Sequence, residues 1–232
     1  MKIIIYGDPH GCLDEFKALR AKINPSPIDR EIVIGDILDR GPYSNELLQY
    51  VREHNIESIL GNHEYKYLRY KKHQDAFLKT GKKNPMNLNE TKLKIFNALD
   101  EDDWKYLENL PFFIKIDNLT LLHAGITNNI DLQTATKKEL EKLLWIRYLK
   151  QENTPLSLGS EDETSKYWAE LYNGQQGIIV YGHEPFKEVR VDKYSLGIDT
   201  GCVYGNKLSA CFISDTQDPL GSYEIVDVAC RK

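Results

Sequence analysis

The sequence predicts an α/β fold, and the pattern of its first third is the reason. Residues 2–6, 31–34 and 57–60 are short runs with β-branched residues, which is typical of buried strands. Residues 14–23 and 45–54 lie between these runs and place their apolar side chains on one helical face. This β-α-β-α-β order predicts a parallel sheet with right-handed crossover connections.

The remainder of the chain alternates between helical and extended patterns. Residues 65–110 are expected to be a helical insertion with a break at 81–85, and Ser44 is expected to cap the helix at 45–54. Further elements are expected as strands at 112–115 and 120–123, as helices at 137–149 and 165–172, and as strands and turns from residue 177 onward. No repeat or linker-like stretch interrupts the sequence, so residues 1–232 are predicted to form a single domain.

The composition is that of a globular protein: of 232 residues, 41% are hydrophobic and 28% are charged. The formal net charge of −5 argues against sequence-independent binding to nucleic acid, so no stable nucleic-acid complex is expected. The apolar run at residues 3–6 is shorter than a secretory core, and no run is long enough to cross a bilayer, so we expect a cytoplasmic protein without a membrane partner. The four cysteines form no CxxC pair and are expected to be reduced thiols.

Short polar motifs follow each of the three early strands and two later ones. They are GDPHG at 7–11, GDILDRG at 35–41, GNHE at 61–64, HAG at 123–125 and YGH at 181–183. The carboxyl ends of parallel strands meet at one edge of a sheet, so these motifs are expected to converge in space. The candidate metal ligands that they supply are Asp8, His10, Asp36, Asn62, His123 and His183.

The mixture of carboxylate, imidazole and amide ligands suits divalent ions such as Mn²⁺, Fe²⁺ or Zn²⁺. One ion seldom takes all of these ligands, and the two oxygens of Asp36 can bridge a pair of ions. Two ions about 3.5–4 Å apart can hold a hydroxide between them for direct attack on phosphorus. The sequence therefore predicts a hydrolase of phosphate esters or anhydrides that uses two metal ions.

Other phosphatase chemistries lack their motifs in this sequence. No cysteine is followed six positions later by arginine, so a thiolate mechanism has no nucleophile loop. No DxDx[TV] aspartyl nucleophile and no GxxxxGK[ST] phosphate loop occur either. Water activated by metal is the chemistry that remains.

The ordered set of motifs resembles the calcineurin-like metallophosphoesterases. More narrowly, it is similar to the group that contains protein serine/threonine phosphatases and bacterial symmetrical diadenosine-tetraphosphate hydrolases. The resemblance covers residues 1–208, and two further segments, 144–147 and 197–205, are similar to the bacterial members. It implies a four-layered fold, with a central β-sandwich flanked by helices. It also implies two divalent metal ions, with Mn²⁺ as the first choice and iron, Zn²⁺ or Ni²⁺ as alternatives.

The resemblance also implies how the ligands are divided between the two ions. Asp8 and His10 would bind the first ion, with His183 completing that site, and Asp36 would bridge. The second ion would be held by Asn62, His123 and a further histidine, which is again His183 or a neighbour. The place of His183 therefore stays open.

Four further residues receive catalytic roles from the resemblance. His63 would be the general acid that protonates the departing oxygen, and Asp39 would hydrogen-bond its imidazole. Arg40 and Arg147 would clamp the non-bridging phosphate oxygens with their forked guanidinium groups.

Three classes of function follow from this reading. The first, which is the main prediction, is phosphomonoester hydrolysis in the manner of a serine/threonine protein phosphatase. The second is symmetrical bis(5′-nucleosyl)-tetraphosphatase activity, or another nucleotide pyrophosphohydrolase activity. The third is a scaffold that binds without cleaving, which the complete ligand set argues against. The substrate is accordingly expected to be a phosphorylated protein or a nucleotide, and the sequence does not indicate an oligomeric state.

One feature bears on the substrate. Basic residues crowd the stretch 66–83, directly after the GNHE motif, and Asp75 is the one acid among them. This stretch is either a solvated helix face or a basic rim that steers polyanionic substrates into the cleft. Trp145 is expected to pack in the core rather than to stack on a substrate.

Overall fold

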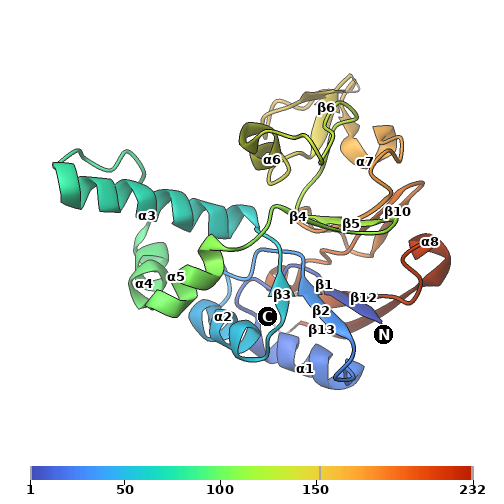
Figure 1. The fold of residues 1–232 in the computed structure, drawn as a ribbon, viewed down its shortest axis with the longest axis horizontal. Coiled ribbons are helices and arrows are strands. Elements are labelled where there is room, and N and C mark those ends of the chain that lie inside the picture. Colours follow the sequence, from blue (N-terminus) through green and yellow to red (C-terminus); the bar gives the residue numbers. More distant parts are fainter. Residues whose placement is uncertain (1, 152, 231–232) are drawn as a thin grey trace.

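The computed structural model describes residues 2–151 and 153–230 of the chain (Figure 1). The strands are β1 (Ile3–Tyr6), β2 (Arg30–Val33), β3 (Glu57–Ser58), β4 (Phe113–Ile116), β5 (Leu119–Leu122), β6 (Tyr148–Lys150), β7 (Thr154–Pro155), β8 (Lys166–Tyr167), β9 (Ile178–Tyr181), β10 (Arg190–Asp192), β11 (Ser195–Gly197), β12 (Lys207–Ile213) and β13 (Tyr223–Ala229). The helices are α1 (Leu13–Ile23), α2 (Ser44–Glu53), α3 (Asn62–Thr80), α4 (Glu90–Ala98), α5 (Glu101–Glu108), α6 (Lys137–Lys142), α7 (Trp168–Leu171), the 3₁₀ helix η1 (Cys202–Tyr204) and α8 (Pro219–Ser222). Within these described residues, no helix is both long and apolar enough to span a membrane.

Two mixed sheets form the centre of the fold. The described strands make one five-stranded sheet in the order β13-β12-β1-β2-β3 and another in the order β10-β11-β9-β5-β4, with a small third sheet β7-β6-β8. The predicted parallel pairing of β1, β2 and β3 is confirmed, and β5, β9 and β11 are also parallel neighbours. β12 and β13 complete the first sheet in antiparallel register, with β12 beside β1 and β13 at the edge.

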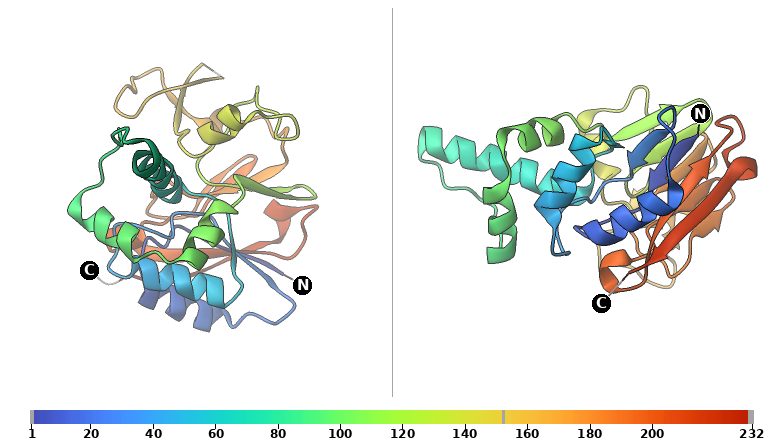
Figure 2. Two further views of the ribbon diagram at one scale, coloured as in Figure 1. Left: turned by 60° about the vertical axis from the view of Figure 1, so that its left-hand side comes forward. Right: turned by 90° about the horizontal axis from the view of Figure 1, so that it is seen from below.

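The buried side chains show that the layers stack as helix, sheet, sheet and helix. In β1, Ile3 and Ile5 belong to the apolar cluster between the two sheets, whereas Ile4 and Tyr6 face α1 and α2 on the other side. This split follows from the alternation of side chains along a strand. The outer face of the second sheet is covered by the segment that carries α6 and α7, around the buried Trp168 (Figures 1 and 2). The prediction of a four-layered α/β fold is confirmed.

α3, α4 and α5 lie between β3 and β4, in the stretch expected to be helical. α3 has 19 residues and is therefore about 28 Å long at about 1.5 Å per residue. Its free end projects away from the sheets (Figures 1 and 2). Aromatic contacts from Tyr70 to Phe96 and from Phe96 to Trp104, with ring centroids 4.9 and 5.2 Å apart, join the three helices. These contacts pack α4 and α5 against the middle of α3.

Three local predictions were wrong. Ser44 is not the N-cap of α2 but its first residue, and its hydroxyl instead accepts a hydrogen bond from the Asp39 backbone at 3.0 Å. The helix expected at 137–149 ends at Lys142, and its last residues form β6. The helix expected at 165–172 is divided between β8 and the short α7. In the last two cases, tertiary pairing among β6, β7 and β8 outweighs local helical periodicity.

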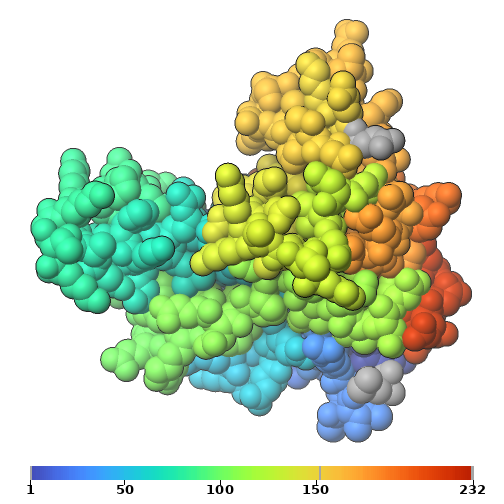
Figure 3. All heavy atoms as spheres, turned by 45° about the horizontal axis from the view of Figure 1, so that its top comes forward, coloured from blue at the N-terminus to red at the C-terminus, as the bar shows by residue number. Residues whose placement is uncertain are grey.

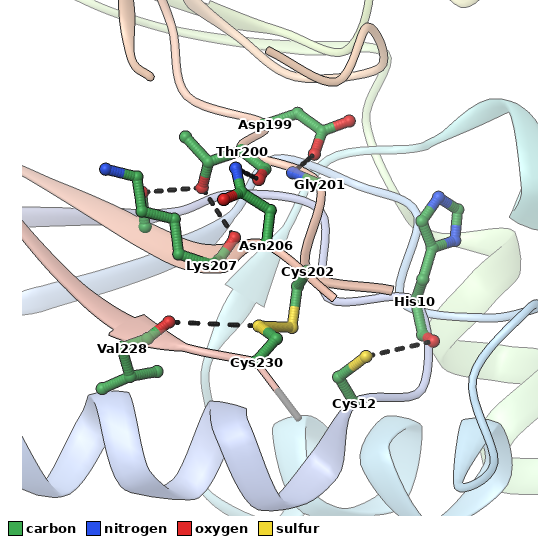
Figure 4. The surroundings of a disulfide bond; sticks show 11 residues. His10, Cys12, Asp199, Thr200, Gly201, Cys202, Asn206, Lys207, Val228 and Cys230 are labelled. Atoms are coloured by element: carbon green, nitrogen blue, oxygen red, sulfur yellow. Dashed lines mark hydrogen bonds between the residues drawn. A yellow bond between two sulfur atoms is a disulfide. The ribbon is translucent and has the colours of Figure 1, made fainter. Parts of the chain in front are cut away.

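The expectation of reduced thiols was wrong for two of the four cysteines. Cys202, at the start of η1, forms a disulfide with Cys230, which follows β13 (Figure 4). The β12–β13 hairpin brings the two together across 28 residues of sequence, and the Cys230 amide donates to the Asn206 carbonyl at 2.8 Å. Cys12 and Cys211 are buried free thiols.

Candidate metal centre and active site

The candidate residues lie where strands of both sheets end. Asp8 follows β1 and Asp36 follows β2, while Asn62 opens α3 after β3. In the second sheet, His123 follows β5 and His183 follows β9. Because β1, β2 and β3 are parallel, and β5 and β9 are parallel, these ends lie together where the two sheets meet.

The backbone around these residues is strained. Positive φ angles occur at five non-glycine residues of the predicted site: His10 (42°), Asp36 (52°), Asp39 (75°), Arg40 (71°) and His183 (72°). Left-handed backbone at residues with a Cβ costs on the order of 1–2 kcal/mol each. Such strain persists only where the surrounding structure enforces it, and it concentrates at functional sites.

Glu64 enforces the backbone of the Asp36 loop. Its buried carboxylate accepts hydrogen bonds from three amides: Asp36 at 2.9 Å, Leu38 at 2.9 Å and Gly61 at 3.2 Å. A Cβ on Gly61 would overlap the Asp36 amide, so glycine is required for this close approach. Burial, together with the Asp36 carboxylate, raises the pKa of Glu64 to about 6. This single side chain therefore fixes the loop after β2 to the start of α3.

Asp36 lies at the centre of two groups of potential ligands. His10, Asp36 and His63 form one group, and Asp36, His123 and His183 form the other, with the ligand atoms of each group within 4.8 Å of one another. Asp36 Oδ2 lies 3.4 Å from His10 Nε2, and Asp36 Oδ1 lies 3.4 Å from His123 Nε2. The two oxygens thus face opposite groups, which is the arrangement of a bridging carboxylate.

The second group also includes Asn62. Asn62 Oδ1 lies 2.9 Å from His123 Nε2 and 2.8 Å from His183 Nδ1, and all three side chains are buried. The His123 ring is oriented by the Ile34 carbonyl, 2.9 Å from Nδ1. The sequence left the place of His183 open, and the structure brings it to Asn62 and His123.

Asp8 lies beside this second group but has an unsatisfied atom. Asp8 Oδ2 accepts a hydrogen bond from the His183 amide at 2.8 Å, and a Cβ on Gly182 would overlap Asp8 Oδ1. Among the described residues, no hydrogen-bond partner exists for Asp8 Oδ1 or for His183 Nε2, although both are buried. Buried polar atoms without partners are costly, so these two atoms fit a site for cations.

The electrostatics of the site also fit cations. Burial, together with Asp199 and Asp36, raises the pKa of Asp8, and burial raises that of Asp199 to about 6. Burial opposes ionisation of Asp36 too, but His123 and His63 hold its pKa well below the ordinary value. Burial lowers the pKa of His10 to about 4, so its imidazole is neutral at pH 7 and free to bind a metal ion. Burial opposes protonation of His123 too, but the Asp36 carboxylate raises its pKa. A pocket of buried carboxylates and imidazoles is stabilised by divalent ions.

His63 and Asp39 form the hydrogen-bonded pair that the sequence suggested. His63 Nδ1 lies 2.6 Å from Asp39 Oδ2, and the His63 amide donates to Asp36 Oδ1 at 3.0 Å. The other Asp39 oxygen accepts a hydrogen bond from the Tyr67 hydroxyl at 2.6 Å. The Lys92 ammonium, from α4, also contacts Asp39. His63 is thus held with Nε2 directed toward Asp36, 3.9 Å from its Oδ2.

The two arginines lie beside the site with different partners. Arg40 is exposed and contacts the Tyr204 hydroxyl, with its guanidinium 5.4 Å from the Tyr204 ring centroid. Arg147 pairs with Glu184, the residue after His183. Burial lowers the pKa of His183, and the nearby charges of His123 and Arg147 lower it further. Neither guanidinium contacts the Asp36-centred groups directly in the hydrogen bonds and ion pairs of the described residues.

The prediction that Trp145 packs in the core was wrong. Its side chain is 44% exposed, and its ring lies 6.5 Å from the His183 ring at an interplanar angle of 89°. The sequence pattern assumed that a helix continues through this position, whereas α6 ends at Lys142.

Several residues of the site escaped the sequence analysis. Glu64 belongs to a motif that was recognised, but its contacts with the loop after β2 span 26 and 28 residues. Lys92 reaches Asp39 across 53 residues, and no pattern around Lys92 distinguishes it from neighbouring surface lysines. Asp199 lies in the segment 197–205, which the sequence linked only to a family resemblance, and its burial beside Asp8 has no local signal.

Comparisons with known proteins agree with this geometry. A family model of the calcineurin-like phosphoesterases matches residues 1–217. The asymmetrical bis(5′-nucleosyl)-tetraphosphatase PrpE of Oceanobacillus iheyensis is 33% identical over 237 residues, covering 90% of this chain and 88% of the relative. The protein of the same description from Bacillus subtilis is 31% identical over 221 residues, covering 88% of each. A crystal structure of a candidate diadenosine tetraphosphatase superposes with a TM-score of 0.78 at 23% identity, covering 99% of this chain and 93% of the other.

The fold, the paired ligand groups and these matches define a metal-dependent hydrolase that acts on phosphoester bonds. The chain belongs to the calcineurin-like phosphoesterase family, whose members use a dinuclear centre of divalent metal ions. The relatives favour the nucleotide class of substrate, which the sequence analysis placed second to a protein phosphatase. They are described as asymmetrical, whereas the sequence analysis named symmetrical cleavage.

Proposed function

We propose that this protein hydrolyses dinucleoside tetraphosphates asymmetrically, converting diadenosine tetraphosphate and water into ATP and AMP. The observation that carries the reaction class is Asp36, one of whose oxygens lies 3.4 Å from His10 Nε2 and the other 3.4 Å from His123 Nε2. The substrate class is supported by relatives of 31–33% identity that share this description across nearly the whole chain.

We propose Asp8, His10, Asp36, Asn62, His123 and His183 as the ligands of two divalent ions, with Mn²⁺ as the native metal. The preference for Mn²⁺ rests on donors that are oxygen and imidazole nitrogen, with no thiolate among them. When bound, the ions supply positive charge that polarises the phosphate and lowers the pKa of water. His183 is proposed to bind with Asn62 and His123, because Asn62 Oδ1 lies within 3 Å of a ring nitrogen of each histidine.

The chain itself supplies the proton for the leaving group. His63 is proposed to donate from Nε2 to the departing phosphate oxygen, because Asp39 occupies Nδ1 at 2.6 Å and leaves Nε2 facing the cleft. Asp39 is in turn oriented by Tyr67 and Lys92, so it holds the imidazole in one rotamer and one tautomer. A misoriented ring would present no proton to the leaving oxygen.

Arg40 and Arg147 are proposed to bind the non-bridging oxygens of the phosphate chain. Both guanidinium groups lie beside the ligand groups. Arg40 contacts the Tyr204 hydroxyl and Arg147 pairs with Glu184, and a bound phosphate can displace these partners or bind alongside them. A guanidinium offers two parallel donors, which match a pair of phosphate oxygens.

The proposal is tested by comparing kcat/KM of the Mn²⁺-loaded protein for diadenosine tetraphosphate and for a panel of phosphoserine and phosphothreonine peptides. A preference for the dinucleotide of at least tenfold is expected, and the Asp36→Asn variant serves as the blank. A preference for phosphopeptides would make the protein a phosphatase of proteins and overturn the proposal.

A further inference from the structure

A groove of about 1060 Å³ opens directly beside the metal centre, between α3 and α6. In the space-filling view, α3 forms a lobe beside the segment that carries α6, and the surface is hollowed between them (Figure 3). Leu60, Tyr65 and Trp145 line the end of the groove that adjoins the GNHE motif and His183. The groove therefore adjoins the site where phosphate chemistry is proposed, with Trp145 standing between the groove and His183.

One wall of the groove is a single face of α3. Tyr65, Arg69, Lys72, Ala76 and Lys79 line it, and their spacing of four, three, four and three residues places them in one stripe along the helix. This is the stretch that the sequence analysis read as either a solvated face or a basic rim. The structure directs these basic residues into the groove.

The opposite wall adds further cations. Lys137, Lys138 and Lys142 of α6 line it, so that seven lysine and arginine side chains border the groove against three carboxylates. Of the seven, Lys71 is paired with Asp75 at 2.8 Å. Arg69, Lys72 and Lys138 are exposed and form no ion pair with any residue that the structure describes. A chain with a formal net charge of −5 thus concentrates unpaired positive charge in one groove.

Trp145 presents an aromatic surface at the inner end of this groove. It is 44% exposed, and its ring meets the His183 ring edge to face at 6.5 Å. Across the groove, Tyr65 packs against Phe112 at 6.1 Å and carries the Arg69 guanidinium 6.0 Å from its ring centroid. Aromatic rings with interleaved cations favour a ligand that has both a flat base and phosphates.

We propose that the groove between α3 and α6 is the subsite for one nucleotide half of the substrate, with the nucleobase stacked on Trp145 and the phosphates bound by Arg69, Lys72, Lys138 and Lys142. This inference rests on the proposed function, because it assigns a place to part of a dinucleoside polyphosphate. It names ligand-binding residues that lie outside the metal-binding motifs. A phosphopeptide would use the cations but has no general need for an exposed tryptophan beside His183.

The test measures binding of ATP and of inorganic tripolyphosphate to the Mn²⁺-loaded protein by isothermal titration calorimetry. Trp145→Ala is expected to weaken ATP binding by about 5- to 150-fold, the range for loss of one stacked base, and to leave tripolyphosphate binding unchanged. Trp145→Phe should recover most of the loss. Because the side chain is exposed, these substitutions should not disturb folding, and thermal unfolding checks this.

The cationic walls are tested with Arg69→Gln/Lys72→Gln, which should weaken both ligands and reduce the dependence of binding on salt. The matched control is Lys94→Gln/Lys105→Gln, which removes two exposed lysines outside the groove and should change neither affinity. Equal effects of Trp145→Ala on both ligands, or no effect on ATP, would overturn the subsite. A wild-type protein that binds ATP through Trp145 but does not cleave diadenosine tetraphosphate would overturn the proposed function and leave the subsite standing.

Discussion

Replacing the buried Glu64 with alanine should strongly destabilise the protein, because Glu64 satisfies three buried amides. The amides of Asp36, Leu38 and Gly61 would lose their acceptor, and each unsatisfied buried donor costs about 1–3 kcal/mol. Partial relaxation of the loop reduces this total, so we expect a loss of about 3–6 kcal/mol in the free energy of unfolding.

Glu64→Gln separates the hydrogen bonds from the charge. The amide group keeps one acceptor oxygen but turns an NH₂ toward at least one amide donor, which costs about 1–3 kcal/mol. In the metal-free protein, burial raises the pKa of Glu64 to about 6 from 4.5, so ionisation is disfavoured in the fold by on the order of 2 kcal/mol at high pH. Because the folded-state pKa is raised, the contribution of Glu64 is complete below about pH 4.5 and is lost as pH rises through about 6.

The assay is urea unfolding in chelator at pH 5 and pH 8, for wild type, Glu64→Ala, Glu64→Gln and the exposed control Glu53→Ala. At pH 5, Glu64→Gln should lower the free energy of unfolding by the full cost of about 1–3 kcal/mol, and at pH 8 its stability should come close to that of wild type. Glu64→Ala should be severely unstable at both pH values. The control should stay within about 0.5 kcal/mol of wild type. A Glu64→Ala loss below about 1 kcal/mol would refute the idea that this side chain holds the Asp36 loop.

Three other outcomes are expected. Elemental analysis after metal loading should find two ions per wild-type chain, one ion in His123→Ala and no tightly held ion in Asp36→Asn. Two ions in Asp36→Asn would contradict the bridging role of Asp36. His63→Asn should keep its metal and lower kcat for phenyl phosphate about 10²–10⁴-fold. The loss for 4-nitrophenyl phosphate should be much smaller, because that leaving group scarcely needs a proton. Equal losses on the two substrates would show that His63 is not the acid. Cys202→Ser/Cys230→Ser should lower the free energy of unfolding by about 3–4 kcal/mol, because the disulfide restricts the unfolded chain across a 28-residue separation. Urea unfolding under non-reducing conditions measures this. An unchanged midpoint would mean that the bond does not form in solution.

The sequence predicted the elements whose signals are local. β1, β2 and β3 could be anticipated because each combines a short apolar run with a glycine-containing polar motif, and parallel topology then brings Asp8 and Asp36 to one edge. Apolar periodicity alone placed α1 and α2 within one or two residues of their observed bounds. The same periodicity failed at 137–149, where the pairing of β6 with β7 and β8 outweighs helix propensity.

Contacts distant in sequence that do not follow from strand topology could not be predicted. The sequence predicted that His183 and Asn62 converge but left open which ion His183 binds. The Lys92–Asp39 contact and the Cys202–Cys230 bond span 53 and 28 residues. Each depends on how helices or hairpins pack against one another, and the residues next to them in sequence give no local signal for it. The exposure of Trp145 has the same origin, because it depends on where α6 ends and on how far α3 stands from it.

The most direct measurement is the identity of the products that the Mn²⁺-loaded wild-type protein releases from diadenosine tetraphosphate. Anion-exchange separation over the time course should give ATP and AMP in equal amounts from the first turnovers, with neither product formed by Asp36→Asn. ADP as the sole product would show symmetrical cleavage and contradict the proposed position of attack. The absence of any metal-dependent product would contradict the proposed function itself.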